Sequence, residues 1–139
     1  MIVLDTNVVS ELMKPTPDAA VARWVAGQQA TSLYTTSITQ AEILHGILLL
    51  PAGKRRGALE AAAGAMFEKD FGGRVLPFGG DAANAYAQIA AQRRRSGRPI
   101  SNFDAQIAAI ARTARAAIAT RNIGDYEGCG IKVMNPWDA

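Results

Sequence analysis

The sequence predicts an α/β fold with a mainly parallel sheet that helices cover on both faces. Short apolar runs alternate along the chain with longer segments of helical periodicity. Strands separated by helices need crossover connections, which make neighbouring strands parallel and place helices over the sheet. The 139 residues are 49% hydrophobic and 19% charged, which supplies a packed core and fits one domain spanning residues 1–139.

The first half of the chain predicts two strands, each followed by helices. The run MIVL is apolar and stops at Asp5, as expected of a buried strand that ends at a helix entry. Pro51 and Gly53 separate two later helices, which we expect to form a hairpin. The expected helices are residues 8–13, a second one opening at 17–18, 39–50 and 54–71, and the expected second strand is 31–36.

The second half predicts two more helices and three short strands. The segment Ser96-Gly97-Arg98-Pro99 separates the helices. The expected helices are residues 81–95 and 101–115, and the expected strands are 74–78, 116–120 and an edge strand at 131–134. Ligands of parallel sheets bind beyond the carboxyl ends of the strands, so we expect the chemistry at that edge.

Three carboxylates are placed to meet at that edge of the sheet. Asp5 ends the first strand, and Glu42 and Asp104 each lie in the expected first turn of a helix. Helices of a parallel sheet begin on the side where its strands finish. We therefore expect Asp5, Glu42 and Asp104 to converge despite their separation in sequence.

Each of these acids also has a purely structural interpretation as part of a helix cap. Asp5 is placed to cap the helix that follows it, Thr39 and Glu42 have capping-box spacing, and Ser101 and Asp104 fit its acidic version. A cap contributes only ~1 kcal/mol and is compatible with metal binding, because a helix amino terminus favours negative charge.

Convergence of the three acids would call for a cation. Carboxylates about 5 Å apart repel by roughly 3 kcal/mol per pair at an effective dielectric near ~20. A hard divalent ion such as Mg²⁺ or Mn²⁺ offsets this repulsion and supports hydrolysis of a phosphodiester. Zinc is not expected, because His45 and Cys129 are the only histidine and cysteine. His45 is more simply explained as a packed or surface residue.

Polar residues that flank the expected strand ends are further candidates. Thr6 and Asn7 can bind a phosphate or orient a metal-bound water, although turn or cap chemistry explains them equally well. Asn122 has the same two interpretations, as a ligand to water or an Asx-turn residue, and Asp125 follows in the same loop. Trp137 is more simply a tail anchor than a base-stacking platform.

The charge distribution indicates a polyanionic partner. The net charge is +3 and the isoelectric point is about 9.4. Two basic clusters, Lys54-Arg55-Arg56 and Arg93-Arg94-Arg95 with Arg98, are candidates for an RNA backbone site, or are solvated helix ends. The sequence has no basic leader before an apolar run and no long apolar segment, so we expect a cytoplasmic protein without a membrane span.

Four segments resemble a known family. The segments IVLDTNVVSEL, TSITQAEILHGI, NFDAQIAAIAR and AIATRNIGDYEGCGIKVMNPW together are similar to PIN domains of the VapC and FitB type, the toxins of bacterial toxin–antitoxin pairs. The resemblance implies a three-layer α/β/α sandwich, a homodimer and Mg²⁺- or Mn²⁺-dependent endoribonuclease activity, commonly on tRNA or other structured RNA. It also implies an antitoxin partner, whose tail crosses the acidic groove and competes with metal and substrate.

The resemblance also assigns roles to single residues. It implies that Asp5 is the first metal ligand, Glu42 the second acid and Asp104 the third. The family often has a fourth acid at the strand end where this chain has Asn122, but many members have asparagine there, and the departure puts a second metal site in doubt. Asp125 is the nearest carboxylate that could contribute there.

Two other functions fit parts of the sequence. One is a module that binds nucleic acid or an antitoxin without cutting, which the retained acids disfavour. The other is a phosphotransfer or phosphatase domain in which Asp5 accepts the phosphoryl group. The chain has no D-x-D motif at Asp5 and no evident catalytic lysine, which disfavours that reaction.

Overall fold

The computed structural model describes residues 1–139 and contains a five-stranded parallel sheet. The strands are β1 (Ile2–Leu4), β2 (Leu33–Thr36), β3 (Val75–Leu76), β4 (Ala117–Ala119) and β5 (Val133–Met134). Their order is β3-β2-β1-β4-β5, and every neighbouring pair is parallel. The predicted parallel sheet is therefore confirmed, with β5 at an edge as expected.

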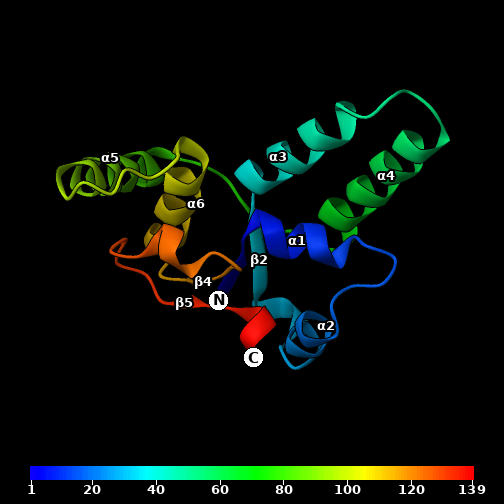
Figure 1. The fold of residues 1–139 in the computed structure, drawn as a ribbon, viewed down its shortest axis with the longest axis horizontal. Coiled ribbons are helices and arrows are strands. Elements are labelled where there is room, and N and C mark those ends of the chain that lie inside the picture. The colour runs from blue at the N-terminus through cyan, green and yellow to red at the C-terminus, as the bar shows by residue number, and fades with distance from the viewer.

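Six helices connect the strands. They are α1 (Thr6–Leu12), α2 (Ala19–Ala26), α3 (Ser37–Leu48), α4 (Lys54–Ala65), α5 (Gly80–Arg95) and α6 (Asn102–Thr113). A wider π-helical turn, Met66–Asp70, extends α4. Short 3₁₀ turns occur at Ala30–Ser32, Ile123–Tyr126 and Pro136–Asp138. Helices α3 and α4 form the expected hairpin, and Figure 1 shows it on the opposite side of the molecule from α5 and α6.

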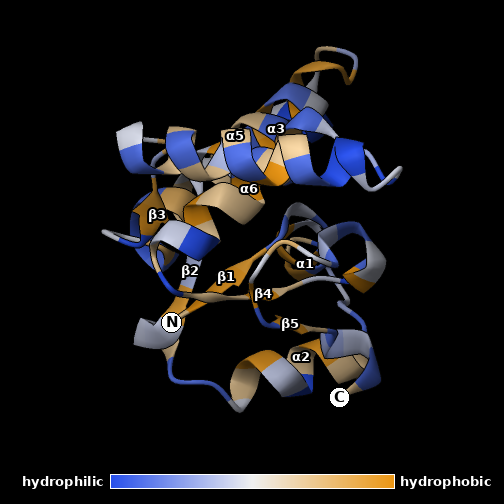
Figure 2. Ribbon diagram, turned by 90° about the vertical axis from the view of Figure 1, so that its left-hand side faces the viewer, coloured by the Kyte–Doolittle hydropathy of each residue, from blue (hydrophilic) through white to orange (hydrophobic).

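The helices cover both faces of the sheet. Successive strand residues point to opposite faces, so each strand contributes to two separate cores. Val3 and Ile118 belong to a core packed against α5 and α6, whereas Leu4 and Ala119 belong to a core with α1 to α4. Figure 2 shows β1 and β5 coloured as hydrophobic and α5 carrying hydrophilic bands. This arrangement confirms the three-layer α/β/α sandwich.

Helix α3 begins earlier than the sequence predicted. Thr36, still in extended conformation, is its N-cap, and the Thr36 hydroxyl accepts a hydrogen bond from the Thr39 amide at 3.1 Å. Thr39 thus lies inside the first turn, and Glu42 lies in the second. The capping-box interpretation of Thr39 and Glu42 is therefore wrong, and the Glu42 carboxylate is not used as a cap.

The order of the strands creates a switch point beside β1. The chain moves outward from β1 through β2 to β3, and then returns to the other side of β1 to form β4 and β5. Such a reversal opens a crevice at the carboxyl ends of the two central strands. Asp5 follows β1 and Thr120 follows β4 at this point. No helix of the chain is long and apolar enough to span a membrane.

Candidate active site

Asp5 is a buried carboxylate held by three donors. Its side chain is 4% exposed. The carboxylate accepts hydrogen bonds from the Thr6 amide at 2.8 Å, the Thr120 hydroxyl at 2.8 Å and the Asn7 side-chain amide at 3.4 Å. Burial raises the pKa of Asp5, and the bonds from Thr120 and Thr6 oppose that rise. Asp5 also caps α1, as its structural interpretation predicted. A cap at a helix amino terminus is compatible with metal binding by the same carboxylate.

Glu42 is linked to Asp5 through Thr6. The Thr6 hydroxyl donates to Glu42 Oε1 at 2.8 Å and lies 3.0 Å from the Thr39 hydroxyl oxygen. Partial burial raises the pKa of Glu42, the bond from Thr6 opposes the rise, and the charges of Asp5 and Asp104 increase it. Thr6 therefore connects two acids, one through its amide and one through its hydroxyl.

Asp104 joins the other two acids from α6. Its amide donates to the Ser101 hydroxyl at 3.2 Å, which is the expected cap. Its Oδ1 accepts a hydrogen bond from the Tyr126 hydroxyl at 3.3 Å. The charge of Asp104 raises the pKa of both Asp5 and Glu42. The structure thus brings Asp5, Glu42 and Asp104 together, and we call this set the acidic centre.

The acidic centre fits a hard divalent cation by its chemistry. It offers only carboxylate oxygens. Burial is the main cause of the raised pKa of Asp5 and of Glu42, and the charge of Asp104 adds to both, a repulsion that a cation relieves. The acids do not form a ready-made cage, because no group of three or more acidic, histidine or cysteine side chains has metal-holding geometry. Mg²⁺ commonly takes one or two carboxylates and keeps several waters, so a complete cage is not required.

Asn122 and Asp125 lie in the loop after β4, and neither side chain forms a hydrogen bond with the acidic centre. Both side chains are exposed. The Asx turn considered for Asn122 is not formed; its amide instead donates to the Thr120 hydroxyl oxygen at 3.1 Å. Asn7 is committed to the site's framework, because its amide donates to Asp5 and Thr120 and its Oδ1 accepts from the Arg121 amide.

Sequence reasoning did not single out Thr120 or Tyr126. Thr120 is fully buried and donates to Asp5, and Tyr126 is 1% exposed with its hydroxyl between Asp5 and Asp104. Burial and the two acidic charges raise the pKa of Tyr126 far above its ordinary value. The available signal was their place in the segment ATRNIGDY, directly after a predicted strand.

Arg93 is not the surface cation that the sequence predicted. It is 6% exposed, and its guanidinium donates to the carbonyl oxygens of Arg98 at 2.7 Å, Asp125 at 2.8 Å and Glu127 at 3.1 Å. Its place on the inner face of α5 contradicts the expectation that it binds RNA. Arg94 and Arg95 are exposed on the same turn.

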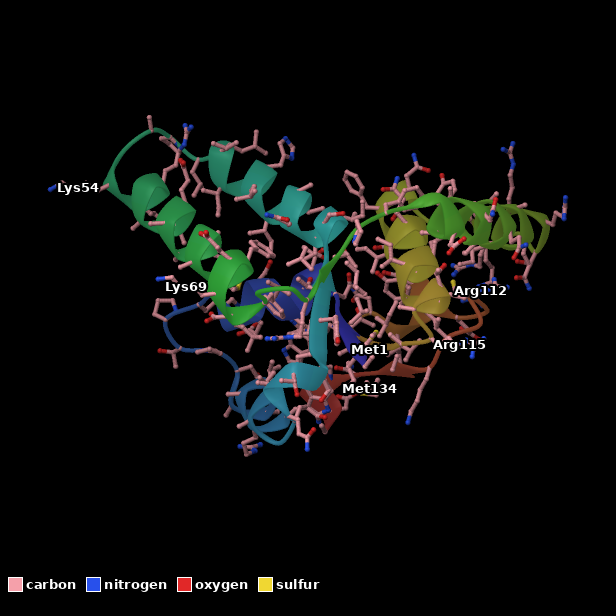
Figure 3. The ribbon with its side chains drawn as sticks, turned by 180° about the vertical axis from the view of Figure 1, so that it is seen from behind. Met1, Lys54, Lys69, Arg112, Arg115 and Met134 are labelled. Atoms are coloured by element: carbon pink, nitrogen blue, oxygen red, sulfur yellow. The ribbon has the colours of Figure 1, made fainter.

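The other residues of the two basic clusters differ in their contacts. Arg98 pairs with Glu127 at 3.1 Å, and Arg56 pairs with Glu60 at 3.0 Å. Lys54 points outward from the tip of the α3–α4 hairpin (Figure 3). A groove of about 380 Å³ between α1, α3 and α4 runs from Thr6 and Glu42 to Arg55.

Trp137 and His45 both have the simpler of the roles considered for them. Trp137 packs against the core beside α2, which confirms it as a tail anchor, and Arg121 lies over its ring at 5.1 Å from the centroid. His45 is an exposed residue on α3.

Fold and site together define a class of protein: a parallel α/β domain with an all-carboxylate centre at the switch point of its sheet. The family model of the PIN domain matches residues 2–124. The chain therefore belongs to the PIN-domain family.

Named relatives cover nearly the whole chain. The VapC ribonuclease Y4jK of Sinorhizobium fredii is 43% identical over 138 residues, which are 99% of each chain. The toxin FitB of Neisseria gonorrhoeae is 36% identical over 137 residues, again 99% of each chain. The crystal structure of FitAcB from Neisseria gonorrhoeae matches with a TM-score of 0.93 at 36% identity and covers 100% of both chains.

Proposed function

We propose that this chain is a metal-dependent endoribonuclease that hydrolyses RNA phosphodiesters and acts as the toxin of a toxin–antitoxin pair. The observation that carries the proposal is the convergence of Asp5, Glu42 and Asp104 at the switch point of a PIN-type sheet. The relatives named as a VapC ribonuclease and a toxin, matched over nearly their full length, support it.

Within this proposal, Mg²⁺ or Mn²⁺ is held by Asp5 and Asp104. When bound, the ion would polarise the phosphodiester and lower the pKa of an attacking water. Asp5 suits a ligand because three donors fix its carboxylate. Glu42 suits a residue that positions the attacking water and accepts its proton, because partial burial raises its pKa above that of an ordinary glutamate and Thr6 orients its carboxylate.

The proposed RNA site flanks the acidic centre with basic side chains. Arg94, Arg95 and Arg98 lie at the end of α5, beside the loop that carries Tyr126, and Arg55 lines the groove that begins at Glu42. Arg121 extends this set, because its amide is tied to Asn7 next to Asp5 and the Trp137 ring supports its guanidinium. We propose structured RNA such as tRNA as the substrate, held through its phosphates.

The proposed partners are a cognate antitoxin and a second copy of the chain. The groove between α1, α3 and α4 has apolar walls and reaches Glu42. An antitoxin segment in this groove would approach the acidic centre and compete with metal and RNA. Homodimerisation is proposed from the family resemblance.

A non-cutting binding module is the second candidate, favoured by the lack of a ready-made metal cage and by Asn122 in place of a fourth acid. The test is incubation of purified chain with a tRNA pool in Mg²⁺, Mn²⁺ or EDTA, together with Asp5→Asn and Asp104→Asn variants. Asp81→Asn is the matched control, because Asp81 is an exposed acid in the first turn of α5.

We expect metal-dependent cleavage by the native chain and Asp81→Asn, and loss of cleavage in the other two variants. Tight RNA binding without cleavage in Mn²⁺ would replace the nuclease proposal with the binding module. Cleavage that persists in both Asp5→Asn and Asp104→Asn would come from a contaminant and remove support for the acidic centre.

A further inference from the structure

Arg93 and Tyr126 are two buried residues that the proposed reaction leaves without a role. Tyr126 lies in the 3₁₀ turn Ile123–Tyr126, and its ring packs in the core beneath α5 and α6. Arg93 enters the same region from α5 and contacts the backbone on both sides of Tyr126. Their contacts connect the last basic cluster of α5 to the acidic centre.

The Tyr126 hydroxyl is placed between two carboxylates. It donates to Asp104 Oδ1 at 3.3 Å and lies close enough to the Asp5 carboxylate for each group to influence the pKa of the other. An ionised carboxylate only accepts hydrogen bonds, so the single proton of the Tyr126 hydroxyl is donated to Asp104 while the hydroxyl oxygen lies near Asp5. A phenylalanine would fill the same space in the core without donating to Asp104.

Arg93 fixes the turn from which Tyr126 reaches the acids. One guanidinium nitrogen, Nη1, donates to the carbonyls of Asp125 and Glu127, the neighbours of Tyr126 on either side. Nε donates to the carbonyl of Arg98. No carboxylate pairs with Arg93, so backbone carbonyl oxygens and the Cys129 sulfur, at 3.6 Å from Nη1, compensate its buried charge. A rigid fork of donors suits this clamp better than the single ammonium of lysine.

We propose that Tyr126 is a positioning residue for the acidic centre, and that Arg93 acts through it by clamping the backbone on both sides. The Tyr126 hydroxyl orients Asp104 relative to Asp5, and a divalent cation therefore binds less well when the hydroxyl is removed. This inference rests on the proposed metal-dependent function. Tyr126 is thus proposed as the hydrogen-bond partner of the metal ligand Asp104, and not as a metal ligand itself.

The test is calorimetric titration of Mn²⁺ into the full chain without RNA, for the native protein and Tyr126→Phe. Removing a hydrogen-bond partner of a metal ligand commonly lowers affinity by about 10–100-fold, and we expect a loss in that range. Tyr86→Phe is the matched control, because the Tyr86 hydroxyl donates to Asn102 at 3.2 Å and not to an acid. We expect native affinity in that control.

Two further variants examine the clamp. Arg93→Lys keeps the charge and loses the fork, so we expect lower Mn²⁺ affinity, whereas Arg23→Lys, at an exposed arginine on α2 outside the basic clusters, should bind Mn²⁺ as the native chain does. In RNA cleavage, Tyr126→Phe should require more Mn²⁺ for half-maximal rate while KM for RNA at saturating Mn²⁺ stays unchanged. A role confined to packing would leave the Mn²⁺ requirement unchanged.

The outcomes separate this inference from the proposed function. Native Mn²⁺ affinity in folded Tyr126→Phe overturns the positioning role and leaves the nuclease proposal standing. Failure of the native chain to bind Mn²⁺ overturns both. If Tyr126→Phe does not fold, as judged by circular dichroism, Arg93→Lys decides, and native affinity in that variant overturns the inference.

Discussion

Replacing Thr120 by valine removes one donor from the buried Asp5 carboxylate while preserving side-chain volume. Thr120 is fully buried, and its hydroxyl donates to Asp5 Oδ2 at 2.8 Å. The Thr120 hydroxyl oxygen also accepts from the Asn7 side-chain amide at 3.2 Å and from the Asn122 backbone amide at 3.1 Å. The substitution therefore leaves Asp5 with fewer donors and two amides without their acceptor.

The expected loss of stability follows from the charge of the acceptor. A hydrogen bond to a charged group contributes about 1.5–3 kcal/mol, whereas one between neutral groups contributes about 1 kcal/mol. We expect Thr120→Val to lower the free energy of unfolding by about 2–3 kcal/mol at neutral pH. Thr35→Val is the matched control, because Thr35 is equally buried but donates to the neutral Leu4 carbonyl at 3.2 Å.

The pH dependence distinguishes the charged bond from simple packing. Burial already raises the folded pKa of Asp5 above its unfolded value, so ionising Asp5 lowers stability as the pH rises through that interval. The Thr120 hydroxyl opposes this rise, and removing it raises the folded pKa of Asp5 further. The loss in Thr120→Val should therefore be larger near pH 7 than near pH 4, where Asp5 is increasingly protonated.

Urea unfolding followed by tryptophan fluorescence at both pH values measures the difference. The loss in Thr35→Val should be near 1 kcal/mol and nearly independent of pH. An equal loss at both pH values in Thr120→Val would refute the argument that Thr120 acts on the ionised form of Asp5.

Three further predictions concern the acid, the surface and a helix cap. Asp5→Asn should abolish RNA cleavage and reduce the decline in metal-free stability as pH rises from ~4 toward neutrality, which urea unfolding across that range checks; an unchanged decline would count against a raised Asp5 pKa. Arg94→Ala and Arg95→Ala should each reduce the slope of log affinity for RNA against log salt by about 1, measured by fluorescence anisotropy; unchanged slopes would remove them from the RNA site. Thr36→Ala should lower the free energy of unfolding by about 1 kcal/mol, because Thr36 caps α3; no loss in thermal or urea unfolding would contradict that cap.

Most of the fold was predictable because local pattern and topology agree in this chain. The apolar run before Asp5 is short, lacks breakers and ends at a helix-capping residue, so β1 and its exit were unambiguous. Pro51 and Gly53 marked the turn of the α3–α4 hairpin. Parallel connectivity then placed the strand ends, and with them the acids, at one edge of the sheet.

The sequence predictions were wrong at two places. One was the start of α3, where two threonines could each be the N-cap, and the other was the direction in which the arginines of α5 point. Thr36 and Thr39 are both good caps, and only the end of β2 decides that Thr36 is used. The sequence does not distinguish the three consecutive arginines 93–95, but only Arg93 lies on the buried face of α5.

The segment ATRNIGDY marked the region of Tyr126, but its contact with an acid could not be predicted from local pattern. Its contact with Asp104 joins residues 22 positions apart, and no periodicity of the chain indicates it.

The central claim is that Asp5 and Glu42 act in one catalytic centre, and a double-substitution cycle on RNA cleavage tests it most directly. The measurement compares cleavage rates at saturating Mn²⁺ for the native chain, Asp5→Asn, Glu42→Gln and the double variant. Residues that act as a unit give non-additive losses, so the double variant should be no slower than the slower single variant. Losses that multiply in the double variant, or near-native rates in either single variant, would contradict a shared centre.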